Sequence, residues 1–320
     1  MKTQTEFLTL REHIRGVIVG QAELIDHILV GLLTGGHLLL EGPPGVAKTT
    51  AVKALASGVH ASFQRIQFTP DLMPSDLTGS DIFDPRESRF EFSPGPLFHE
   101  IVLADEINRA PPKVQSALLE AMEEHQVTVG STTHPLPDLF VVMATQNPLE
   151  QAGTYPLPEA QLDRFLLHVL IDYPDESEEF DILQRDRHRH FDDAPPSLET
   201  RLHPETVLQA RREVAEIYME PEVEKYIVRL VQATRRPEKW VPEWQGYIEF
   251  GASPRASLAL VRSASAYAYL HGREYVVPDD VLALAPSVLR HRILPSFSAR
   301  SQALNSDAII SGLLETIPVP

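Results

Sequence analysis

A glycine-rich loop between two apolar segments is the part of the sequence with the clearest chemistry. It follows the run 38–40 and precedes a helix-like run at 51–56, and its residues are Gly42, Pro43, Pro44, Gly45, Val46, Ala47, Lys48, Thr49 and Thr50. A chain that turns from strand to helix on glycines points several backbone N–H groups into one small cavity, and the positive end of the helix dipole points there too. Lys48 would add a mobile charge for the outer phosphates, and the Thr49 hydroxyl is a natural Mg²⁺ ligand. The loop therefore predicts a site for a nucleoside triphosphate.

One residue in this loop departs from the standard pattern. Glycine is expected immediately before the lysine, whereas this chain has Ala47. A methyl group is tolerated there if the residue has an ordinary negative φ. A strand–helix turn that binds nothing is the competing interpretation, because short motifs also match by chance.

Two adjacent acidic residues follow another apolar run. The run 101–104 leads directly into Asp105 and Glu106, and parallel sheets carry their active sites at the carboxyl ends of their strands. Asp105 would be a second Mg²⁺ ligand beside Thr49, while Glu106 would orient or activate the attacking water. Acids that end a strand can also be simple helix N-caps, but the phosphate loop upstream favours the catalytic interpretation.

A third apolar run, 140–144, leads into the polar residues Thr145, Gln146 and Asn147. In a parallel sheet these side chains would lie beside the two acids. An amide at that place can hydrogen-bond the γ-phosphate or the attacking water. A turn asparagine ahead of Pro148 is the alternative for Asn147 taken alone.

Three arginines are candidates for stabilising charge in the transition state. Arg109 and Arg164 lie outside any evident apolar stripe, and either could be an arginine finger, an effect worth roughly 10³–10⁵ in rate in other phosphoryl-transfer systems. Arg255 follows Ser253 and Pro254, which mark a helix start, so the helix dipole disfavours a cation there. Such a placement suggests an anionic partner, for which a nucleotide phosphate would serve, although a surface arginine without a role fits as well.

The elements that must position these residues alternate between strand-like and helix-like segments. Short runs typical of strands buried on both faces occupy 38–40, 63–68, 101–104, 140–144 and 166–171. Helical patterns lie between them, most clearly at 113–124. The alternation predicts an α/β fold, a parallel sheet flanked by helices, over residues 1–175. A charged junction is expected at 176–200, and residues 201–320, where only helices are evident, would form an all-α lid domain.

The composition narrows the classes of function. The 320 residues carry a formal charge of −17, which argues against a general nucleic-acid coat because phosphate neutralisation needs clustered Lys and Arg. The chain has no cysteine, which excludes disulfides and Cys-based zinc and fits a reducing cytoplasm. No apolar run approaches the length of a membrane span. We therefore expect a cytoplasmic protein without a membrane span, and the charge disfavours nucleic acid as its partner.

With these residues assembled, the chain resembles the MoxR-type AAA+ ATPases over nearly its full length. Residues 42–49 correspond to Walker A, with an alanine at 47 similar to what this family commonly carries, and 101–106 correspond to Walker B. Asn147 falls on sensor 1, Arg255 on sensor 2, and Arg164 matches the arginine finger. The segment 18–21, with Val19 and Gln21, resembles the one that lies against adenine in these ATPases.

The resemblance implies a P-loop NTPase fold, ATP and its product ADP with Mg²⁺ as cofactors, and a homo-oligomeric, hexameric ring. Arg164 would reach the nucleotide of a neighbouring subunit, whereas Arg255 could act in its own subunit or across the interface. Hairpins expected around 82–92 and 126–130 would face the pore, where Phe83, Phe90 and Phe92 could engage a client or simply cover the core. A partner with a von Willebrand factor A-type domain is also implied.

The function expected from these features is ATP hydrolysis by a ring-forming chaperone that remodels or activates a protein partner. A metal-chelatase motor subunit and a nucleic-acid motor are the alternatives among related pore-hairpin ATPases. A nucleotide-binding switch without turnover is a third, and the presence of both Asp105 and Glu106 argues against it.

Overall fold

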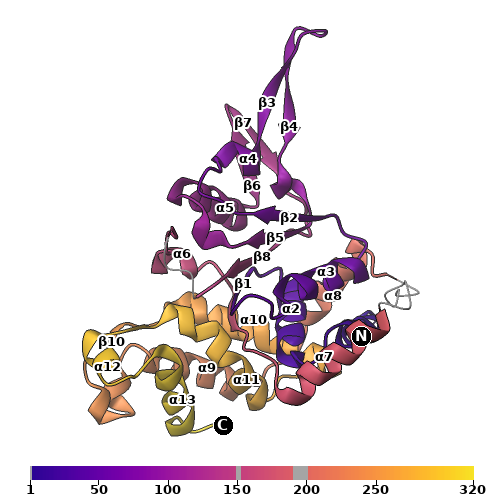
Figure 1. The fold of residues 1–320 in the computed structure, drawn as a ribbon. Helices are drawn as coiled ribbons and strands as arrows, with labels where there is room; N and C mark the ends of the chain where they lie inside the picture. The colour runs from indigo at the N-terminus through magenta and orange to yellow at the C-terminus, as the bar shows by residue number, and fades with distance from the viewer. Residues whose placement is uncertain (1, 149–152, 190–200) are drawn as a thin grey trace.

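Five parallel strands form the central sheet, in the order β2-β5-β8-β1-β9 (Figure 1). The computed structural model describes residues 2–148, 153–189 and 201–320. The strands of the sheet are β1 (Leu38–Glu41), β2 (Phe63–Gln67), β5 (Ile101–Asp105), β8 (Val141–Gln146) and β9 (Leu167–Leu170). All five predicted strands are present, so the α/β prediction is confirmed.

Successive side chains of a strand point to opposite faces of the sheet, and here the residues on both faces are apolar and buried. Leu38 and Leu40 join one apolar core, and Leu39 between them joins the other. The same alternation runs through β5 and β8. Near-continuous apolar runs of this kind fit a parallel sheet covered on both faces, and they fix which polar residues emerge at the strand ends.

Helices cover the two faces (Figure 1). The first core lies against the N-terminal helices and the lid, and the second lies against α4 and α5. The helices of this part are α1 (Gln4–Val17), α2 (Ala22–Thr34), α3 (Lys48–Gly58), α4 (Pro74–Thr78), α5 (Pro112–Glu124) and α6 (Glu159–Leu162), with short 3₁₀ turns at Pro96–Phe98 and Ile107–Arg109.

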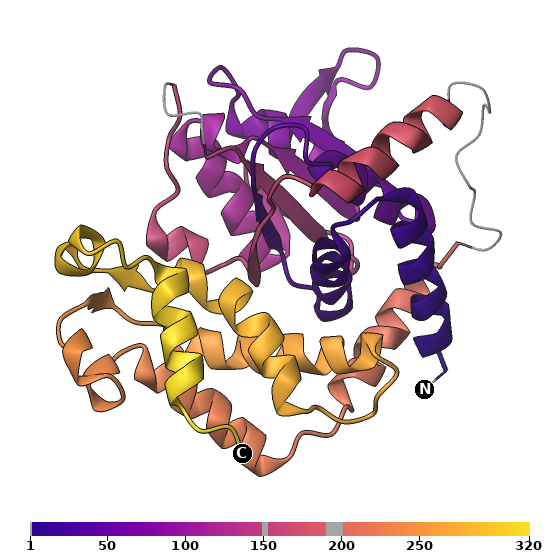
Figure 2. The ribbon, with the colours of Figure 1, turned by 60° about the horizontal axis from the view of Figure 1, so that its bottom comes forward.

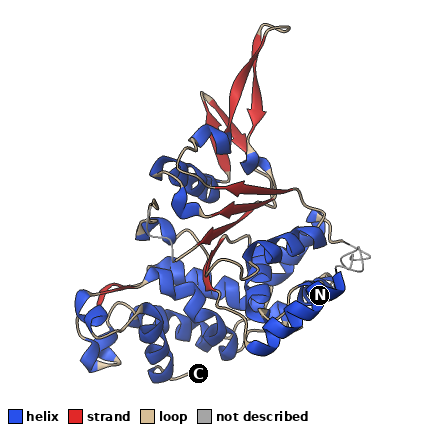
Figure 3. Ribbon diagram, in the orientation of Figure 1, coloured by secondary structure: helices blue, strands red, loops and turns tan. Residues whose placement is uncertain are grey.

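The C-terminal part is helical, with one exception. Its helices are α8 (Pro204–Ala215), α9 (Pro221–Ala233), α10 (Pro254–Leu270), α11 (Pro278–Leu289), α12 (Phe297–Ser301) and α13 (Ser306–Thr316), with 3₁₀ turns at Pro237–Lys239, Pro242–Trp244 and Arg290–Arg292. The exception is a short antiparallel ribbon of β10 (Ile248–Phe250) and β11 (Leu294–Pro295), visible in Figure 3. The all-α prediction missed this ribbon because two segments of so few residues carry no readable alternation.

The expected charged junction at 176–200 contains helix α7 (Glu176–Arg189). The Arg185 guanidinium donates to the Gly16 carbonyl at 2.7 Å, so α7 lies beside the end of α1, as Figure 2 also shows. Residues 190–200 lie outside the described part, and the domain limits at 175 and 200 stay a prediction. Among the described residues, no helix is long and apolar enough to cross a membrane.

Two antiparallel hairpins extend from the sheet domain (Figure 1). They are β3 (Gly79–Asp84) with β4 (Arg89–Pro94), and β6 (Gln126–Val129) with β7 (Thr132–Pro135). Phe83 and Phe90 are exposed and in contact with each other. Phe92 is half-buried, and its ring stacks on His134 from the second hairpin, 3.8 Å between centroids. The two hairpins are thereby joined.

Candidate active site

The glycine-rich loop turns the chain from β1 into α3. The Gly42 N–H donates to the Gln146 carbonyl at 3.3 Å. A Cβ on Gly42 would lie 2.4 Å from the Ile171 carbonyl oxygen, which explains the glycine there. Gly45 has φ +86°, a conformation that side chains disfavour. Apart from its two chain neighbours, no described residue has an atom within 4 Å of where its Cβ would be, so the glycine is required by its backbone conformation and not by a close contact.

Ala47 does not have the negative φ under which a methyl group is tolerated at this position. It is the N-cap of α3 and has φ 60° and ψ 13°, the left-handed region, so an alanine holds a conformation that glycine adopts without strain. The turn from the loop into α3 therefore places Ala47 in a conformation that its methyl group disfavours.

Lys48 lies at the first position of α3, folded back over the loop. Its ammonium donates to the carbonyls of Gly42 at 2.5 Å and Gln146 at 3.3 Å. Burial lowers the pKa of the Lys48 ammonium, and the nearby carboxylates of Asp105, Glu106 and Glu41 act in the opposite direction. The two carbonyls hold a cation beside the loop, where the phosphates of a nucleotide would replace them.

Asp105 ends strand β5 and is almost fully buried. One carboxylate oxygen accepts from the Thr145 hydroxyl at 2.5 Å. The other accepts two bonds from the Arg65 guanidinium of the neighbouring strand β2, at 3.0 and 2.6 Å. Charge-assisted bonds of this kind fix the position of a carboxylate.

Glu106 has a strained backbone, with φ 59°. Its N–H donates to the Thr145 hydroxyl at 2.9 Å. Its carboxylate accepts from the Gln67 amide at 2.7 Å and pairs with Arg109 at 3.2 Å. Non-glycine residues in this region cluster at functional sites, because strain of about 1–3 kcal/mol persists only where the surroundings enforce it. With this backbone conformation, the Glu106 carboxylate lies at the same edge of the sheet as Lys48.

The three strand ends therefore meet at one edge of the sheet. Thr145 touches both acids, the carbonyl of Gln146 touches Lys48, and Asn147 follows directly and is buried. This juxtaposition of a phosphate-type loop, two carboxylates and an amide is what the sequence predicted for Lys48, Asp105 and Asn147.

A cavity of about 380 Å³ opens beside the loop. Its lining consists of Gly45 through Thr50, Val17 through Val19, and Ile182 and Arg185 of α7. Val19 thus lies where the adenine segment was expected. Gln21 lies instead at a left-handed turn (φ 50°), and its amide donates to the Asp172 carbonyl at 3.2 Å.

Arg164 and Arg255 lie in a different groove. Both bind the Glu123 carboxylate, Arg164 through Nε at 2.7 Å and Arg255 through Nη2 at 2.8 Å. This arginine groove, lined by Glu123, Arg164, Arg255, Leu258 and Arg262 among others, shares no described lining residue with the cavity at the loop. Arg109 is the one predicted arginine that lies at the acids. Within this subunit, the anionic group that binds Arg255 is the Glu123 carboxylate.

Several residues at the site were not predicted from the sequence. Arg65 and Gln67 alternate with apolar residues in β2, and their relevance depends on β2 lying next to β5, which the sequence order does not reveal. Ile182 and Arg185 lie in a segment we interpreted as a charged junction. Glu123 lies within the helical pattern predicted at 113–124, where its residue type alone indicates no role. The acidic residues at the start of α7 are typical of a helix N-terminus and could have indicated that helix.

Comparisons with known proteins agree with this geometry. Residues 37–167 match the ATPase family associated with various cellular activities (AAA), and residues 245–312 match the AAA lid domain. Chaperone MoxR1 of Mycobacterium tuberculosis is 44% identical over 96% of this chain and 80% of its own. The chain belongs to the MoxR family of AAA+ ATPases.

Two further likenesses extend over almost the whole chain. The uncharacterized protein YeaC of Bacillus subtilis is 47% identical over 97% of this chain and 93% of its own. A crystal structure from Cytophaga hutchinsonii, described as a "putative ATPase", is 41% identical, has a TM-score of 0.91 and covers 100% of this chain and 97% of its own. This MoxR protein accordingly binds nucleotide and hydrolyses ATP.

Proposed function

We propose that this MoxR protein is the subunit of a hexameric ring that uses ATP hydrolysis to remodel or activate a protein partner in the cytoplasm. One observation carries the catalytic part: Thr145 joins both acids, at 2.5 Å to Asp105 and 2.9 Å to Glu106, beside the ammonium of Lys48. The cytoplasmic location stays a prediction.

The residues present fit MgATP. Thr49 and Asp105 supply two oxygens for Mg²⁺, which ordinarily takes its remaining ligands from phosphates and water. The bound ion would neutralise charge on the phosphates. Lys48 would bind the outer phosphates in place of its present carbonyl partners. Glu106 would orient and deprotonate the attacking water. The Gln67 amide and Arg109 would hold the Glu106 carboxylate until substrate binds. Asn147 would hydrogen-bond the γ-phosphate or that water.

The ring supplies what the isolated subunit lacks. Arg164 and Arg255 share no cavity with the phosphate loop in their own subunit. In a head-to-tail ring, the arginine groove of one subunit would face the nucleotide of the next, so that both guanidiniums act on a neighbour's phosphates. We accordingly assign Arg255 to the interface.

The paired hairpins supply a client-binding surface. Ile82, Phe83 and Phe90 have exposed fractions of 56%, 50% and 71%, and they lie on the hairpin that projects from the sheet domain in Figure 1. Exposed apolar groups of this kind favour a protein partner over a polynucleotide, and the charge of −17 points the same way. A partner with a von Willebrand factor A-type domain is the client we propose.

The catalytic assignment is tested with two substitutions. Lys48→Ala should abolish ATP binding in calorimetry, whereas Glu106→Gln should bind ATP as the wild type does and release no phosphate. Glu120→Gln, on the exposed side of α5, is the matched control and should hydrolyse normally. Wild-type turnover by Glu106→Gln would show that another group activates the water.

Mixing two inactive variants tests the ring. Arg164→Ala lacks the finger and Glu106→Gln lacks the base, so each homogeneous ring should be nearly inactive. In mixed rings, some interfaces combine an intact Glu106 with an intact Arg164 from the neighbour, and activity should return in part. Absence of any recovery at every mixing ratio would contradict the placement of Arg164 across an interface.

The client is tested by retention on the ATP-locked ring. Glu106→Gln should retain a specific protein partner in ATP, and adding Phe83→Ser and Phe90→Ser should release it while ATP binding persists. Strong stimulation of ATP turnover by DNA would instead favour the nucleic-acid motor, and retention of a large chelatase subunit would favour the metal-chelatase alternative.

A further inference from the structure

Glu123, the penultimate residue of the long helix that follows the two acids, joins two arginines from different parts of the chain. Arg164 precedes strand β9 and Arg255 lies in the first turn of lid helix α10, and both bind the one carboxylate, at 2.7 and 2.8 Å. The Glu123 side chain is 34% exposed, Arg164 29% and Arg255 56%. The contact thus lies at the rim of the groove, open to a ligand from outside.

The groove has a rigid base. The Arg292 side chain of the lid is only 3% exposed, and it donates to the Asp163 carboxylate at 2.7 Å and to the Phe165 carbonyl at 2.6 Å, on both sides of Arg164. His291 is also buried and hydrogen-bonds the Phe165 carbonyl at 3.0 Å. The backbone that carries Arg164 is therefore clamped by the lid, and the remaining freedom belongs to the Arg164 side chain.

The bonding pattern leaves the right donors available. Glu123 accepts from Nε of Arg164, and no described bond uses the two terminal nitrogens of Arg164. Arg255 donates to Glu123 from one terminal nitrogen, and no described side-chain bond uses its Nε or its other terminal nitrogen. A guanidinium fixed at one edge presents its remaining N–H groups in a planar fork that suits phosphate.

Charge also favours this arrangement. Two guanidiniums beside each other repel, and Arg262 of α10 adds a third positive charge to the same groove. Burial alone would raise the pKa of the Glu123 carboxyl, but Arg164 and Arg255 outweigh it and keep that pKa below its ordinary value. Glu123 is therefore ionised at neutral pH and offsets the repulsion.

We propose that Glu123 is a positioning residue that holds Arg164 and Arg255 together, with their free donors directed outward, for the phosphates bound by the neighbouring subunit. The inference rests on the proposed ring. It adds a residue that touches no nucleotide in its own subunit, because Glu123 lines the arginine groove and not the cavity at the phosphate loop. In a lone subunit, the same carboxylate gives the two cations an anionic partner.

Glu123→Gln is the test, with Glu124→Gln on the exposed neighbouring residue as the matched control. Glutamine can accept from one arginine and carries no charge, so the pair should spread. We expect kcat of the assembled ring to fall about 10–100-fold, by analogy with the loss seen when a residue that orients a metal ligand is removed. KM for ATP and ring assembly measured by sedimentation should not change, and Glu124→Gln should match the wild type.

Mixed rings locate the effect. Glu123→Gln subunits combined with Glu106→Gln subunits should regain activity, since the latter supply an intact arginine pair to a neighbour with an intact base. Recovery supports the proposal; a kcat loss without recovery would mean that Glu123 acts on its own nucleotide site and would overturn it. Wild-type kcat in Glu123→Gln, alongside an inactive Arg164→Ala ring that does recover on mixing, would overturn this inference and leave the proposed function intact.

Discussion

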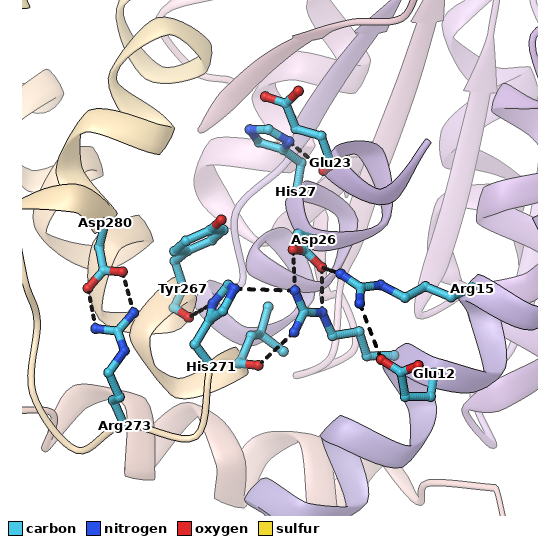
Figure 4. A network of polar contacts seen from close by, with 11 residues as sticks. Glu12, Arg15, Glu23, Asp26, His27, Tyr267, His271, Arg273 and Asp280 are labelled. Atoms are coloured by element: carbon cyan, nitrogen blue, oxygen red, sulfur yellow. Dashed lines mark hydrogen bonds and ion pairs between the residues drawn. The ribbon is translucent and has the colours of Figure 1, made fainter. Parts of the chain in front are cut away.

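Removing the Asp26 carboxylate should destabilise this protein more than any exposed ion pair could. Arg11 and Asp26 form a two-bond pair at 2.6 and 2.5 Å, with only 10% and 9% of their side chains exposed. Figure 4 shows Arg15 beside the same carboxylate, and the two groups lie 3.5 Å apart. Arg11 also donates to the Leu270 carbonyl and contacts His271 of the lid. The network joins helix α1, which leads into the nucleotide cavity, to helix α10.

The magnitude follows from what Asp26→Ala leaves behind. Arg11 would stay buried with a carbonyl and an imidazole as partners, and Arg15 would face it without an intervening negative charge. Breaking a buried pair by removing one partner typically costs about 3–5 kcal/mol, whereas replacing both partners by apolar groups is often close to neutral. We therefore expect Asp26→Ala to lose about 3 kcal/mol or more, and Arg11→Met with Asp26→Leu to recover most of it.

Guanidinium chloride unfolding followed by circular dichroism measures both effects. The double-mutant cycle of Arg11→Met, Asp26→Leu and their combination isolates the pair from the individual side chains. Glu222→Ala is the control, because Glu222 pairs with Lys225 on the surface and its loss should leave the unfolding midpoint unchanged. If Asp26→Ala shifted the midpoint no more than Glu222→Ala does, the buried pair would not hold α1 against the lid.

Three further outcomes follow from single residues. Ala47→Gly should not destabilise the fold and could add up to about 1 kcal/mol in chemical unfolding, because relief of the left-handed strain of about 1–2 kcal/mol exceeds the added chain entropy of about 0.5–1. Gly42→Ala should weaken ATP binding in calorimetry, since its Cβ would lie 2.4 Å from the Ile171 carbonyl oxygen. Burial lowers the pKa of His37 to about 4, and its Nδ1 accepts from the Val142 N–H. The unfolded chain therefore takes up a proton on this side chain below about pH 6.5, and the folded chain does so only near pH 4. The free energy of unfolding should consequently decrease as the pH is lowered from 6.5 to 4, and it should decrease less in His37→Gln.

The elements of this fold were readable because a sheet buried on both faces leaves an unambiguous signal. Runs such as 101–104 have no polar residue to interrupt them, and the two cores take alternate side chains from each strand. The hairpins were readable for the related reason that their alternation is local. The β10–β11 ribbon was not, since its pairing joins Ile248 to Pro295 across the lid.

The site was predictable at the strand ends and not beyond them. Asp105, Glu106 and Asn147 follow strands that share an edge of the sheet, so their residue types and positions were enough. Arg65 reaches Asp105 only because β2 is the neighbour of β5, a matter of strand order.

The backbone conformations at the site could not be predicted from the sequence pattern. Ala47 and Glu106 both have φ near 60°, which neither residue type favours. Such strain is imposed by the surrounding strands and helices, and it exists only once the fold is complete. A motif therefore tells which residues meet a ligand, while the cost of presenting them is set by contacts such as Thr145 with the Glu106 amide, which no local stretch of sequence contains.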